Sequence, residues 1–416
     1  MNKRTIRDLN VRGKRVFVRA DFNVPLDDHG NITDDRRITQ FLPTLEHLVK
    51  SGARVMLASH LGRPTGDPAA DKGLSLRPVA ERIAKLTNRA CAFVDNCIGP
   101  AVVDAASKLK DGETLLLENL RFHKGEDVID KAKKNPDGKL TPEQDAKRQE
   151  FAKALSASAE MYVNDAFGTC HRKHVSMYDV PQVVGTGNRA IGFLVEKELE
   201  YLGKAVNTPK RPLVAVLGGA KVSDKIGVIK ALLAKCDTIL VGGAMMFTFW
   251  AAASRGVGKS LCERDKLDLA RELMATAGGK LKLPVDCVVA SELKAGVATQ
   301  IVEGEVPAEL MGLDIGPKTL AQFGDILNAA GTIVWNGPVG AFETKPFDKG
   351  TFALADLIAK ATARGAVTVI GGGDSAAAVE QAGLAAKMSH ISTGGGASLE
   401  FLEGKKFAAL DVIDDA

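Results

Sequence analysis

The chain has 416 residues, more than one hydrophobic core usually supports, so we expect two domains of about 200 residues each. Hydrophobic residues make up 45% of the sequence and charged residues 25%, which is typical of a soluble globular protein. The formal net charge of +4 is too small to drive binding to nucleic acid or to a membrane surface, so recognition of anions must come from local clusters.

The N-terminal sequence and the cysteines indicate the compartment. Met1 to Leu9 lack the apolar segment of a secretion signal, and no apolar run approaches membrane-spanning length, so we expect a cytoplasmic protein. The six cysteines form no Cys-x-x-Cys pair, which favours reduced structural thiols over a disulfide framework or a zinc site. They are Cys91, Cys97, Cys170, Cys236, Cys262 and Cys287.

In the first half, short apolar runs alternate with segments of helical periodicity. Strands are predicted at residues 14–18, 53–58, 90–94, 114–117 and 161–164. Helices are predicted at residues 39–50, 76–86, 101–109 and 145–156. This alternation is typical of βαβ units, and therefore of a parallel sheet covered by helices on both faces.

The same alternation continues in the second half. Strands are predicted at residues 213–217, 238–241, 285–290, 332–335 and 366–370, with helical segments between them. Residues 192–209 predict a helix that connects the two halves, and the polar stretch 127–144 an exposed surface excursion. The fold class that we predict is α/β, with two doubly wound parallel-sheet domains joined by a helical hinge.

Cationic and polar residues follow the predicted strands of the first half. They are Arg19, Asp21, Asn23, His60, Arg63, Arg121 and Arg172. Ligands of such sheets bind beyond the carboxyl ends of the strands, so these side chains should meet at one edge. Guanidinium groups bind phosphate and carboxylate in a bidentate way, so this edge indicates a small, multiply charged anion. The spacing of His171 and His174 would suit a metal, but Arg172 and Lys173 would repel a cation, so anion binding or a structural role is favoured.

The stretch 212–225 predicts a strand, a tight turn and the start of a helix. Ser223 or Asp224 could cap this helix. Lys221 and Lys225 are four residues apart and would share one face of its first turn, which indicates a polyphosphate site. For this stretch alone, an ordinary loop with two solvated lysines is the alternative.

Glycines end the predicted strands of the second half, where they permit close approach of the backbone to a bulky ligand such as a nucleotide. The groups are Gly218-Gly219, Gly242-Gly243, residues 336–340, Gly371-Gly372-Gly373 and residues 393–398. Their recurrence favours a binding cleft over plain turns. Asp374 and Ser375 follow the triglycine, which offers a helix N-terminus for phosphate and a carboxylate for Mg²⁺.

Two other glycine motifs carry less weight. Gly256-Val-Gly258-Lys259-Ser260 resembles the end of a phosphate-binding P-loop, but Ala253 stands where the first glycine is needed and no strand precedes it. Residues 185–190 fit the dinucleotide-binding fingerprint only loosely, because no clear helix start or acidic residue follows.

Eight motifs, in chain order, closely resemble the phosphoglycerate kinase family. They are Arg19-Ala-Asp-Phe-Asn-Val-Pro25, Ser59-His-Leu-Gly-Arg-Pro64, Leu117-Glu-Asn-Leu-Arg121, Asn164-Asp-Ala-Phe-Gly-Thr-Cys-His-Arg172, Leu217-Gly-Gly-Ala-Lys-Val222, Val334-Trp-Asn-Gly-Pro338, Gly371-Gly-Gly-Asp-Ser375 and Ser392-Thr-Gly-Gly-Gly-Ala-Ser398. The resemblance covers essentially the whole chain. The departures are Ala20, where the family commonly has Val, Cys170, where Ala is frequent, and Ser375, where Thr is usual. None of them removes a charged group.

The resemblance implies phosphoryl transfer from 1,3-bisphosphoglycerate to Mg-ADP, giving 3-phosphoglycerate and Mg-ATP, in glycolysis and gluconeogenesis. It implies that residues 1–190 bind the triose phosphate, with residues 405–416 packing back on them, and that residues 191–404 bind the nucleotide. The implied substrate-binding residues are Arg19, Asp21, Asn23, Arg37, His60, Arg63, Arg121 and Arg172. The implied nucleotide-binding residues are Gly218, Gly219, Lys221, Lys225, Gly242, Asn336, Glu343, Gly371, Gly372, Gly373, Asp374 and Ser375, with Glu343 at the ribose and Asp374 at the metal. Arg37, Lys221, Gly395 and Gly396 are implied in catalysis.

The chemistry of this reaction needs no general base, because the reacting carboxylate, with a pKa near 4, is already ionised at pH 7. Catalysis would then rest on alignment and on charge stabilisation, with closure of the two domains about the hinge. We expect a monomer that acts on small molecules and binds neither nucleic acid nor membrane. The residues alone leave two alternatives: a non-catalytic two-domain protein that clamps an anion, and a dinucleotide-dependent dehydrogenase.

Overall fold

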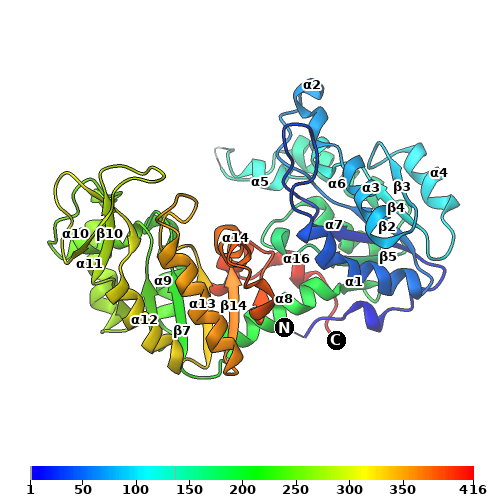
Figure 1. Cartoon of the computed structure of the whole chain (residues 1–416). Coiled ribbons are helices and arrows are strands. Elements are labelled where there is room, and N and C mark those ends of the chain that lie inside the picture. The colour runs from blue at the N-terminus through cyan, green and yellow to red at the C-terminus, as the bar shows by residue number, and fades with distance from the viewer. Residues whose placement is uncertain (1, 136) are drawn as a thin grey trace. The chain divides into compact units, whose positions relative to one another are not determined.

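The computed structural model describes residues 2–135 and 137–416; Met1 in the N-terminal segment and Pro136 in the predicted surface excursion lie outside the described residues. The chain divides into two compact units (Figure 1). The first comprises Met1–Leu199 with Lys406–Ala416, and the second comprises Glu200–Lys405. This division falls inside helix α8, Phe193–Asn207, whereas the expected division lay just before that helix, after residue 190.

The first unit contains a six-stranded parallel sheet of order β3-β4-β2-β1-β5-β6. Its strands are β1 (Arg15–Ala20), β2 (Arg54–Ala58), β3 (Cys91–Val94), β4 (Thr114–Leu117), β5 (Met161–Asp165) and β6 (Arg189–Ile191). In the register of the central strands, Val18 pairs with Leu57 on one side and with Val163 on the other. The five strands predicted from the sequence are confirmed, and β6 is a further short strand at the edge.

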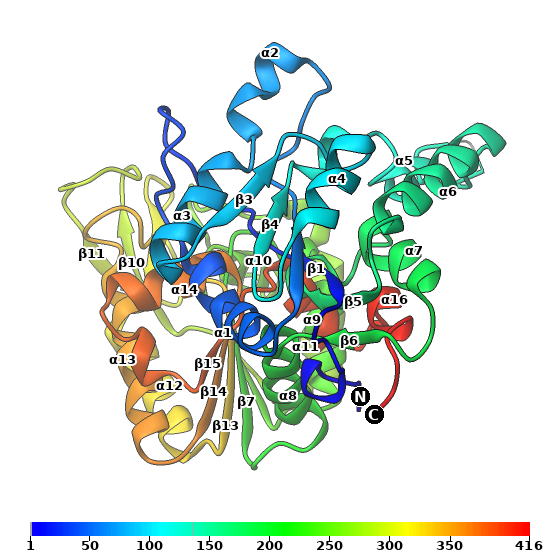
Figure 2. The same ribbon diagram turned by 90° about the vertical axis from the view of Figure 1, so that its right-hand side faces the viewer.

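Helices pack on the sheet of the first unit in two groups. Its helices are α1 (Arg36–Lys50), α2 (Pro68–Asp71), α3 (Arg77–Thr87), α4 (Pro100–Lys108), α5 (Val128–Ala132), α6 (Pro142–Ser156), α7 (Val175–Val184) and α16 (Ala408–Asp411). Helix α1 packs against α3, and α6 packs against α7, which also contacts β5 and α16 (Figure 2). The last segment of the chain, carrying α16, therefore belongs to the first unit.

The central strand of the first unit is buried on both faces, as its continuous apolar sequence predicts. Val16 and Val18 enter the core that α1 covers, where Phe22 and Phe41 meet edge to face with ring centroids 5.2 Å apart. On the opposite face Phe17 stacks on Tyr162 of β5. Two apolar layers thus fix the position of β1, and with it the residues that follow this strand.

The second unit contains a six-stranded parallel sheet of order β15-β14-β13-β7-β8-β9. Its strands are β7 (Leu213–Leu217), β8 (Thr238–Val241), β9 (Leu281–Lys282), β13 (Thr332–Asn336), β14 (Val367–Gly371) and β15 (His390–Ile391). Its helices are α9 (Ile226–Leu233), α10 (Met245–Ala252), α11 (Leu267–Ala277), α12 (Pro317–Ala329), α13 (Lys349–Ala363), α14 (Gly373–Gln381) and α15 (Gly396–Leu402). The predicted fold class, two parallel-sheet α/β domains, is confirmed.

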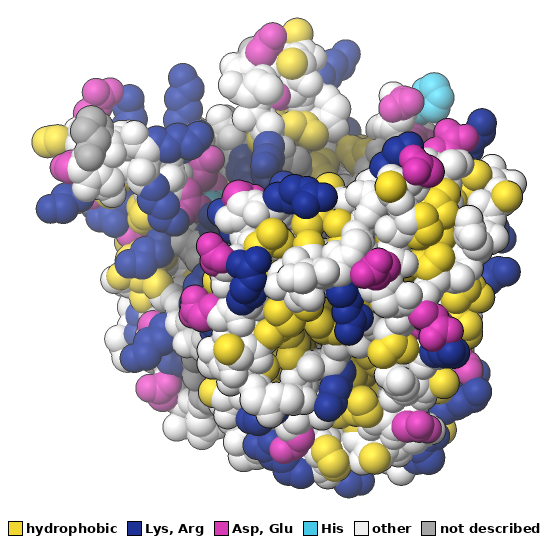
Figure 3. All heavy atoms as spheres, turned by 90° about the vertical axis from the view of Figure 1, so that its left-hand side faces the viewer, with side chains coloured by type: hydrophobic (Ala, Val, Ile, Leu, Met, Phe, Trp, Pro, Cys, Tyr) yellow, Lys and Arg dark blue, Asp and Glu magenta, His cyan; other side chains and the backbone are white. Residues whose placement is uncertain are grey.

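One strand of the second unit lies in a different sheet from the one predicted. β10 (Asp286–Ala290) pairs antiparallel with β11 (Gln300–Glu303) and β12 (Met311–Ile315), so the expected place of residues 285–290 in the parallel series is wrong. The reason is connectivity, because these strands follow one another without a crossover helix, which parallel pairing would need. Figure 3 views the molecule from the end that carries α10, α11 and β10, where cationic, acidic and hydrophobic side chains are interspersed.

Helix α8 is attached to the first unit at its N-terminal end. The backbone N–H of Phe193 donates to Thr44 Oγ1 at 2.9 Å, and that of Val195 donates to Asp165 Oδ1 at 3.0 Å. Burial raises the pKa of Asp165 to about 7, against the lowering effect of hydrogen bonds from the side chain of Thr44 and from the backbone of Val195. Among the described residues, no helix is long and apolar enough to cross a membrane, and all six cysteines carry free thiols.

Candidate functional site

The structure brings the ends of β1, β2 and β5 together in the first unit. Arg19 pairs in register with Ala58 of β2 and with Asn164 of β5. Parallel pairing therefore places the residues after these strands at one edge of the sheet, as predicted from the sequence.

Arg19 itself is completely buried beneath this edge. Its Nε donates to Ser176 Oγ at 2.8 Å, Nη1 donates to the carbonyl of Ala20, and Nη2 lies 3.2 Å from Nδ1 of His60. Nη2 also lies 4.0 Å from Oε1 of Glu126, a fully buried carboxylate. Arg19 is thus surrounded by protein partners, and among the predicted site residues it contacts His60.

His60 is held as a neutral imidazole. Burial pushes its pKa well below 6.5, and this outweighs the opposing attraction of the Asp21 carboxylate. A guanidinium can only donate, so Nδ1 accepts from Arg19 and the ring proton is assigned to Nε2. His60 can therefore donate a hydrogen bond from Nε2 to an anion.

Asp21 and Arg37 form an ion pair through Oδ2 and Nη1. Burial opposes ionisation of Asp21, but Arg37 and Arg19, together with the hydrogen bond from the backbone of Asn23, hold its pKa down at about 2. The second oxygen of Asp21 accepts from the backbone N–H of Asn23 at 3.2 Å. At neutral pH this carboxylate is ionised and can accept a hydrogen bond from a hydroxyl group.

Gly62 joins two more of the predicted residues. Its N–H donates to Asn23 Oδ1 at 2.8 Å, and its carbonyl accepts from Arg121 Nη1 at 2.7 Å. Gly62 has a φ of +60°, and a Cβ there would lie 2.7 Å from Leu74 Cδ2, so glycine suits this position. Arg63 is exposed and makes no hydrogen bond or ion pair with a described residue, whereas Arg172 lies 3.4 Å from Asp130.

A buried polar network behind this edge was missed by the sequence analysis. Glu126 Oε1 accepts from Ser176 Oγ at 2.6 Å, and Nε2 of His174 lies 3.3 Å from Oδ2 of Asp130. The hydrogen bond from His174 holds the pKa of Asp130 well below its usual range. His174 thus pairs with the carboxylates of Glu126 and Asp130. Glu126 and Asp130 follow no strand, so strand-end reasoning could not find them.

In the second unit, three of the five glycine groups, Gly218-Gly219, Gly242-Gly243 and residues 336–340, contribute to a cavity of about 590 Å³, whereas residues 371–373 and 393–398 do not line it. It receives residues from the ends of β7, β8 and β13, together with Phe247, Lys259, Asp314, Glu343 and Asp374. Close backbone approach requires the glycines here, because a Cβ at Gly218 would lie 2.0 Å from the carbonyl oxygen of Pro338. Gly242 is likewise packed against Val339, while Gly219 and Gly243 face the cavity.

The predicted helical arrangement of Lys221 and Lys225 is wrong. Helix α9 begins only at Ile226, after a short 3-10 turn at Ser223–Lys225, so Lys221 precedes any helical turn. Ser223 does not cap the helix, because its hydroxyl and its N–H both donate to Glu263, at 2.5 and 3.0 Å. Lys221 is exposed and makes no ion pair with a described residue.

Lys225 and Asn336 meet at the end of β13. The ammonium group of Lys225 donates to Asn336 Oδ1, and burial lowers the pKa of Lys225 against the attraction of Asp224 and Asp374. Within the described residues, Asn336 Nδ2 is buried without a hydrogen-bond partner, a donor that a ligand could satisfy. Ser375 Oγ accepts from the N–H of Gly337 at 2.6 Å, which ties the triglycine loop to β13.

Two helices of this unit begin at predicted glycines. α14 starts at Gly373 after Gly372, which has a φ of +90°, and Asp374 lies in its first turn. α15 starts at Gly396 after Gly395, and a Cβ at either position would meet open space. Over residues 2–135 and 137–416, no cluster of three or more His, Cys, Asp or Glu side chains could hold a metal. A single carboxylate such as Asp374 fits Mg²⁺, which is commonly held by one or two carboxylates and the phosphates of its substrate.

A family model described as phosphoglycerate kinase matches residues 6–405, which is nearly the whole chain. The chain belongs to the phosphoglycerate kinase family. As a phosphoglycerate kinase family member it is a phosphotransferase, and this decides against the alternatives of a non-catalytic anion-binding protein and of a dehydrogenase.

Relatives and solved structures agree with this assignment. The phosphoglycerate kinase of Chlorobium phaeobacteroides is 48% identical and that of Rhodopirellula baltica 49% identical, each over 419 residues that cover 100% of both chains. The structure of phosphoglycerate kinase from Coxiella burnetii is similar with a TM-score of 0.84 at 38% identity, covering 99% of this chain and 98% of that one. That from Pyrococcus horikoshii OT3 gives a TM-score of 0.82 at 30% identity, with the same coverage.

Proposed function

We propose that the chain catalyses reversible phosphoryl transfer from the acyl phosphate of 1,3-bisphosphoglycerate to Mg-ADP, as a step of glycolysis and gluconeogenesis. The observation that carries this proposal is that the two units offer different kinds of binding groups. The first offers cationic and hydrogen-bonding groups at one sheet edge. The second offers a glycine-lined cavity that includes Lys259, Glu343 and Asp374, and Lys225 contacts Asn336 at the end of β13. Membership of the phosphoglycerate kinase family indicates a phosphotransferase reaction, which would use the groups of both units.

The first unit would bind the triose phosphate. Exposed Arg63 is free to bind a phosphate, and Arg121 and Arg172 would supply further guanidinium groups. His60 would donate from Nε2, and Asp21 would accept from the substrate hydroxyl. Arg19, which the resemblance assigns to the substrate, is better placed to position His60, because it is fully buried among protein partners.

The second unit would bind the nucleotide. Its base and ribose would occupy the cavity between Phe247 and Glu343, and the phosphates would extend towards Lys221, Lys225 and the N-terminus of α14. Asn336 Nδ2 would find its missing hydrogen-bond acceptor on a phosphate. Asp374 would hold Mg²⁺, which when bound supplies charge neutralisation of the phosphate oxygens.

Catalysis would rest on positioning and on charge rather than on a general base. The carboxylate of 3-phosphoglycerate needs neither protonation nor deprotonation at pH 7. Arg37, Lys221 and the backbone N–H groups of Gly395 and Gly396 would stabilise negative charge on the transferring phosphoryl group. Release of Arg37 from Asp21 would make its guanidinium available to that group.

Transfer also requires that ligands held by different units meet. We therefore propose closure about α8, whose N-terminal end is fixed to the first unit by Thr44 and Asp165. Closure would exclude water, which could otherwise take the phosphoryl group. We further propose a cytoplasmic monomer that acts on small molecules only, without nucleic-acid or membrane partners.

The test is a coupled assay of ATP formation from 1,3-bisphosphoglycerate and ADP, with and without Mg²⁺. The proposal predicts ATP formation that depends on both substrates and on Mg²⁺. Absence of ATP formation by the folded protein, or formation at an equal rate in excess chelator, would contradict it. For variants of Lys221 or Lys225, the matched control is Lys85→Gln, which changes an exposed lysine of α3.

A further inference from the structure

A cavity of about 670 Å³ lies in the first unit, beside the predicted triose-phosphate residues but apart from most of them. Of the substrate-binding residues predicted above, all of which are described, Arg121 alone contributes to its lining. This volume falls within the range of small-molecule sites, about 300 to 1,000 Å³. The function proposed above does not use this space.

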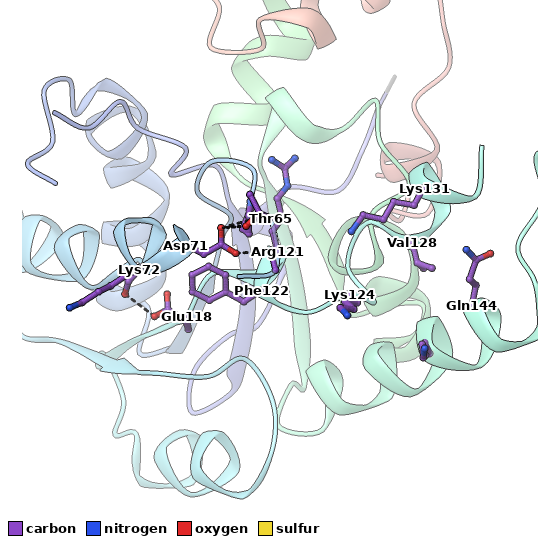
Figure 4. A pocket seen from close by; sticks show the side chains of 14 residues that line it. Thr65, Asp71, Lys72, Glu118, Arg121, Phe122, Lys124, Val128, Lys131 and Gln144 are labelled. Atoms are coloured by element: carbon purple, nitrogen blue, oxygen red, sulfur yellow. Dashed lines mark hydrogen bonds between the residues drawn. The ribbon is translucent and has the colours of Figure 1, made fainter. Parts of the chain in front are cut away.

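Two walls and a floor enclose this cavity (Figure 4). One wall is the segment that carries Thr65, Asp71 and Lys72, and the other carries Val128 and Lys131 on α5 and Gln144 on α6. Phe122 and Lys124 lie between the two walls. The polar excursion predicted at residues 127–144 therefore forms one side of a cavity.

Local hydrogen bonds hold both walls in place. Asp71 accepts from the N–H groups of Thr65 and Gly66, each at 2.8 Å, which closes the first wall into a ring. In the second wall, Gln144 and Thr141 form a reciprocal capping box at the start of α6. Hydrogen bonds between side chains and backbone thus shape both walls of the cavity.

The lining carries a local excess of positive charge. Five cations, Lys72, Arg121, Lys124, Lys131 and Lys147, face two carboxylates, Asp71 and Glu118. Glu118 is occupied by donors of its own wall, with Ser75 Oγ at 2.7 Å and Leu76 N at 2.8 Å.

The cations of the lining differ in their partners. Lys131 pairs with Asp127 at 2.8 Å, and Lys147 pairs with Glu143 at 2.6 Å, each along its own helix. Among the described residues, by contrast, neither Lys72 nor Lys124 has a carboxylate within ion-pair distance, although both are exposed. Lys72 and Lys124 are therefore available to an external anion.

An aromatic ring adds an apolar surface to this cationic cavity. Phe122 has 39% of its surface exposed, which makes it one of the few large exposed hydrophobic side chains of the described chain. Pro64 and Val128 extend this apolar surface on either side. An exposed aromatic face beside free ammonium groups suits a ligand that is flat and apolar at one end and anionic at the other.

We propose that this cavity is a second ligand site, which binds an aromatic phosphate monoester. The ring of the ligand packs on Phe122, and its phosphate group lies towards Lys124. A phosphate is preferred over a monovalent carboxylate because its two charges suit a lining in which five cations face two carboxylates. The site differs from the triose-phosphate edge in its aromatic component, and Arg37, Arg63 and Arg172 do not line it.

The test is calorimetric titration of the full chain with 1-naphthyl phosphate, alone and in the presence of saturating ADP and 3-phosphoglycerate. We expect one equivalent to bind in both conditions. The double variant Lys72→Gln/Lys124→Gln should weaken binding at least tenfold, and Phe122→Ala at least threefold. 1-Naphthol and inorganic phosphate should each bind at least tenfold more weakly than the ester that combines them.

The matched control is Lys85→Gln/Lys110→Gln, which removes two exposed lysines of the same unit outside the cavity and should leave the affinity unchanged. Equal affinities for this control and for Lys72→Gln/Lys124→Gln would overturn the proposal. Complete displacement by ADP or 3-phosphoglycerate would overturn it as well, because the probe would then occupy the sites already described. The titration reads binding and not turnover, so its outcome is independent of the kinase assay.

Discussion

Nη2 of Arg19 lies 3.2 Å from Nδ1 of His60 in the interior of the first unit. Behind this contact the fully buried Glu126 lies 4.0 Å from the same nitrogen, so one carboxylate compensates a buried guanidinium that fixes the tautomer of an imidazole. Removing one member of a buried ion pair costs more than the pair contributes, because the remaining charge is left without compensation. The predicted substrate edge thus depends on Glu126, which contacts no substrate in the function proposed above.

Glu126→Gln should therefore destabilise the first unit by about 3 kcal/mol, because Arg19 loses its buried counter-charge. Both tryptophans, Trp250 and Trp335, lie in the second unit, so their fluorescence reports that unit alone. In urea titrations, unfolding followed by far-UV circular dichroism should gain an earlier phase that tryptophan fluorescence lacks. Glu150→Gln, an exposed control on α6, should change stability by less than about 0.5 kcal/mol. The same midpoint for both variants would show that Glu126 does not compensate Arg19.

The pKa of Asp21 gives a second prediction, on pH. In the folded chain this pKa is about 2, whereas the ordinary pKa of an aspartate, which applies to the unfolded chain, is 3.8. Between these two pH values the unfolded state therefore binds more protons than the folded state. The stabilisation is complete above pH 3.8 and is lost as the pH falls towards 2. Between pH 5 and pH 3 the wild type should lose about 1 kcal/mol more unfolding free energy than Asp21→Asn. Parallel pH profiles in urea unfolding would contradict the ion pair with Arg37.

Arg37→Ala should lower kcat by roughly 10² or more, with a smaller effect on nucleotide affinity, if its guanidinium stabilises the transferring group. The matched control is Arg36→Ala on the same helix, because Arg36 pairs with Asp34. Steady-state kinetics in both directions would measure the two variants. Unchanged turnover of Arg37→Ala would remove this residue from the catalytic set.

Asp374→Asn keeps the shape of the side chain but removes the charge directed at the metal. The Mg²⁺ concentration for half-maximal activity should rise steeply, while 3-phosphoglycerate affinity stays the same. Asp356→Asn, on the neighbouring helix α13, removes a carboxylate that pairs only with Lys360 in the structure and serves as the control. An identical Mg²⁺ titration for Asp374→Asn and wild type would refute the assignment.

The sequence pattern predicted most helices and strands, and it predicted which residues lie at the carboxyl ends of the strands, because both depend on runs of neighbouring residues. Arg19, His60 and Gly218 follow buried apolar runs, and parallel pairing then determines where they lie. The site residues that were missed depend on contacts between distant parts of the chain. Glu126 compensates Arg19 across more than a hundred residues and follows no strand, so nothing near it in the sequence marks its role.

The two errors in the second unit have the same origin. Ser223 or Asp224 was expected to cap a helix, but Glu263 accepts from the hydroxyl and the N–H of Ser223, and the helix begins only at Ile226, after Lys225. The strand at residues 285–290 has the composition expected, but its antiparallel partners are chosen by the short connections that follow it. Neither the hydrogen bonds from Ser223 to Glu263 nor the antiparallel pairing of this strand can be predicted from local propensity and periodicity.

The central claim is that ligands held by separate units react after the units close about α8. Small-angle scattering tests it most directly, on the free chain, on each binary complex, and on the ternary complex with 3-phosphoglycerate and a non-transferable ATP analogue. The account predicts that the radius of gyration falls most in the ternary complex, because only the pair of ligands supplies contacts to both units. The same radius in all liganded states as in the free chain would contradict closure and require a fixed, preformed site.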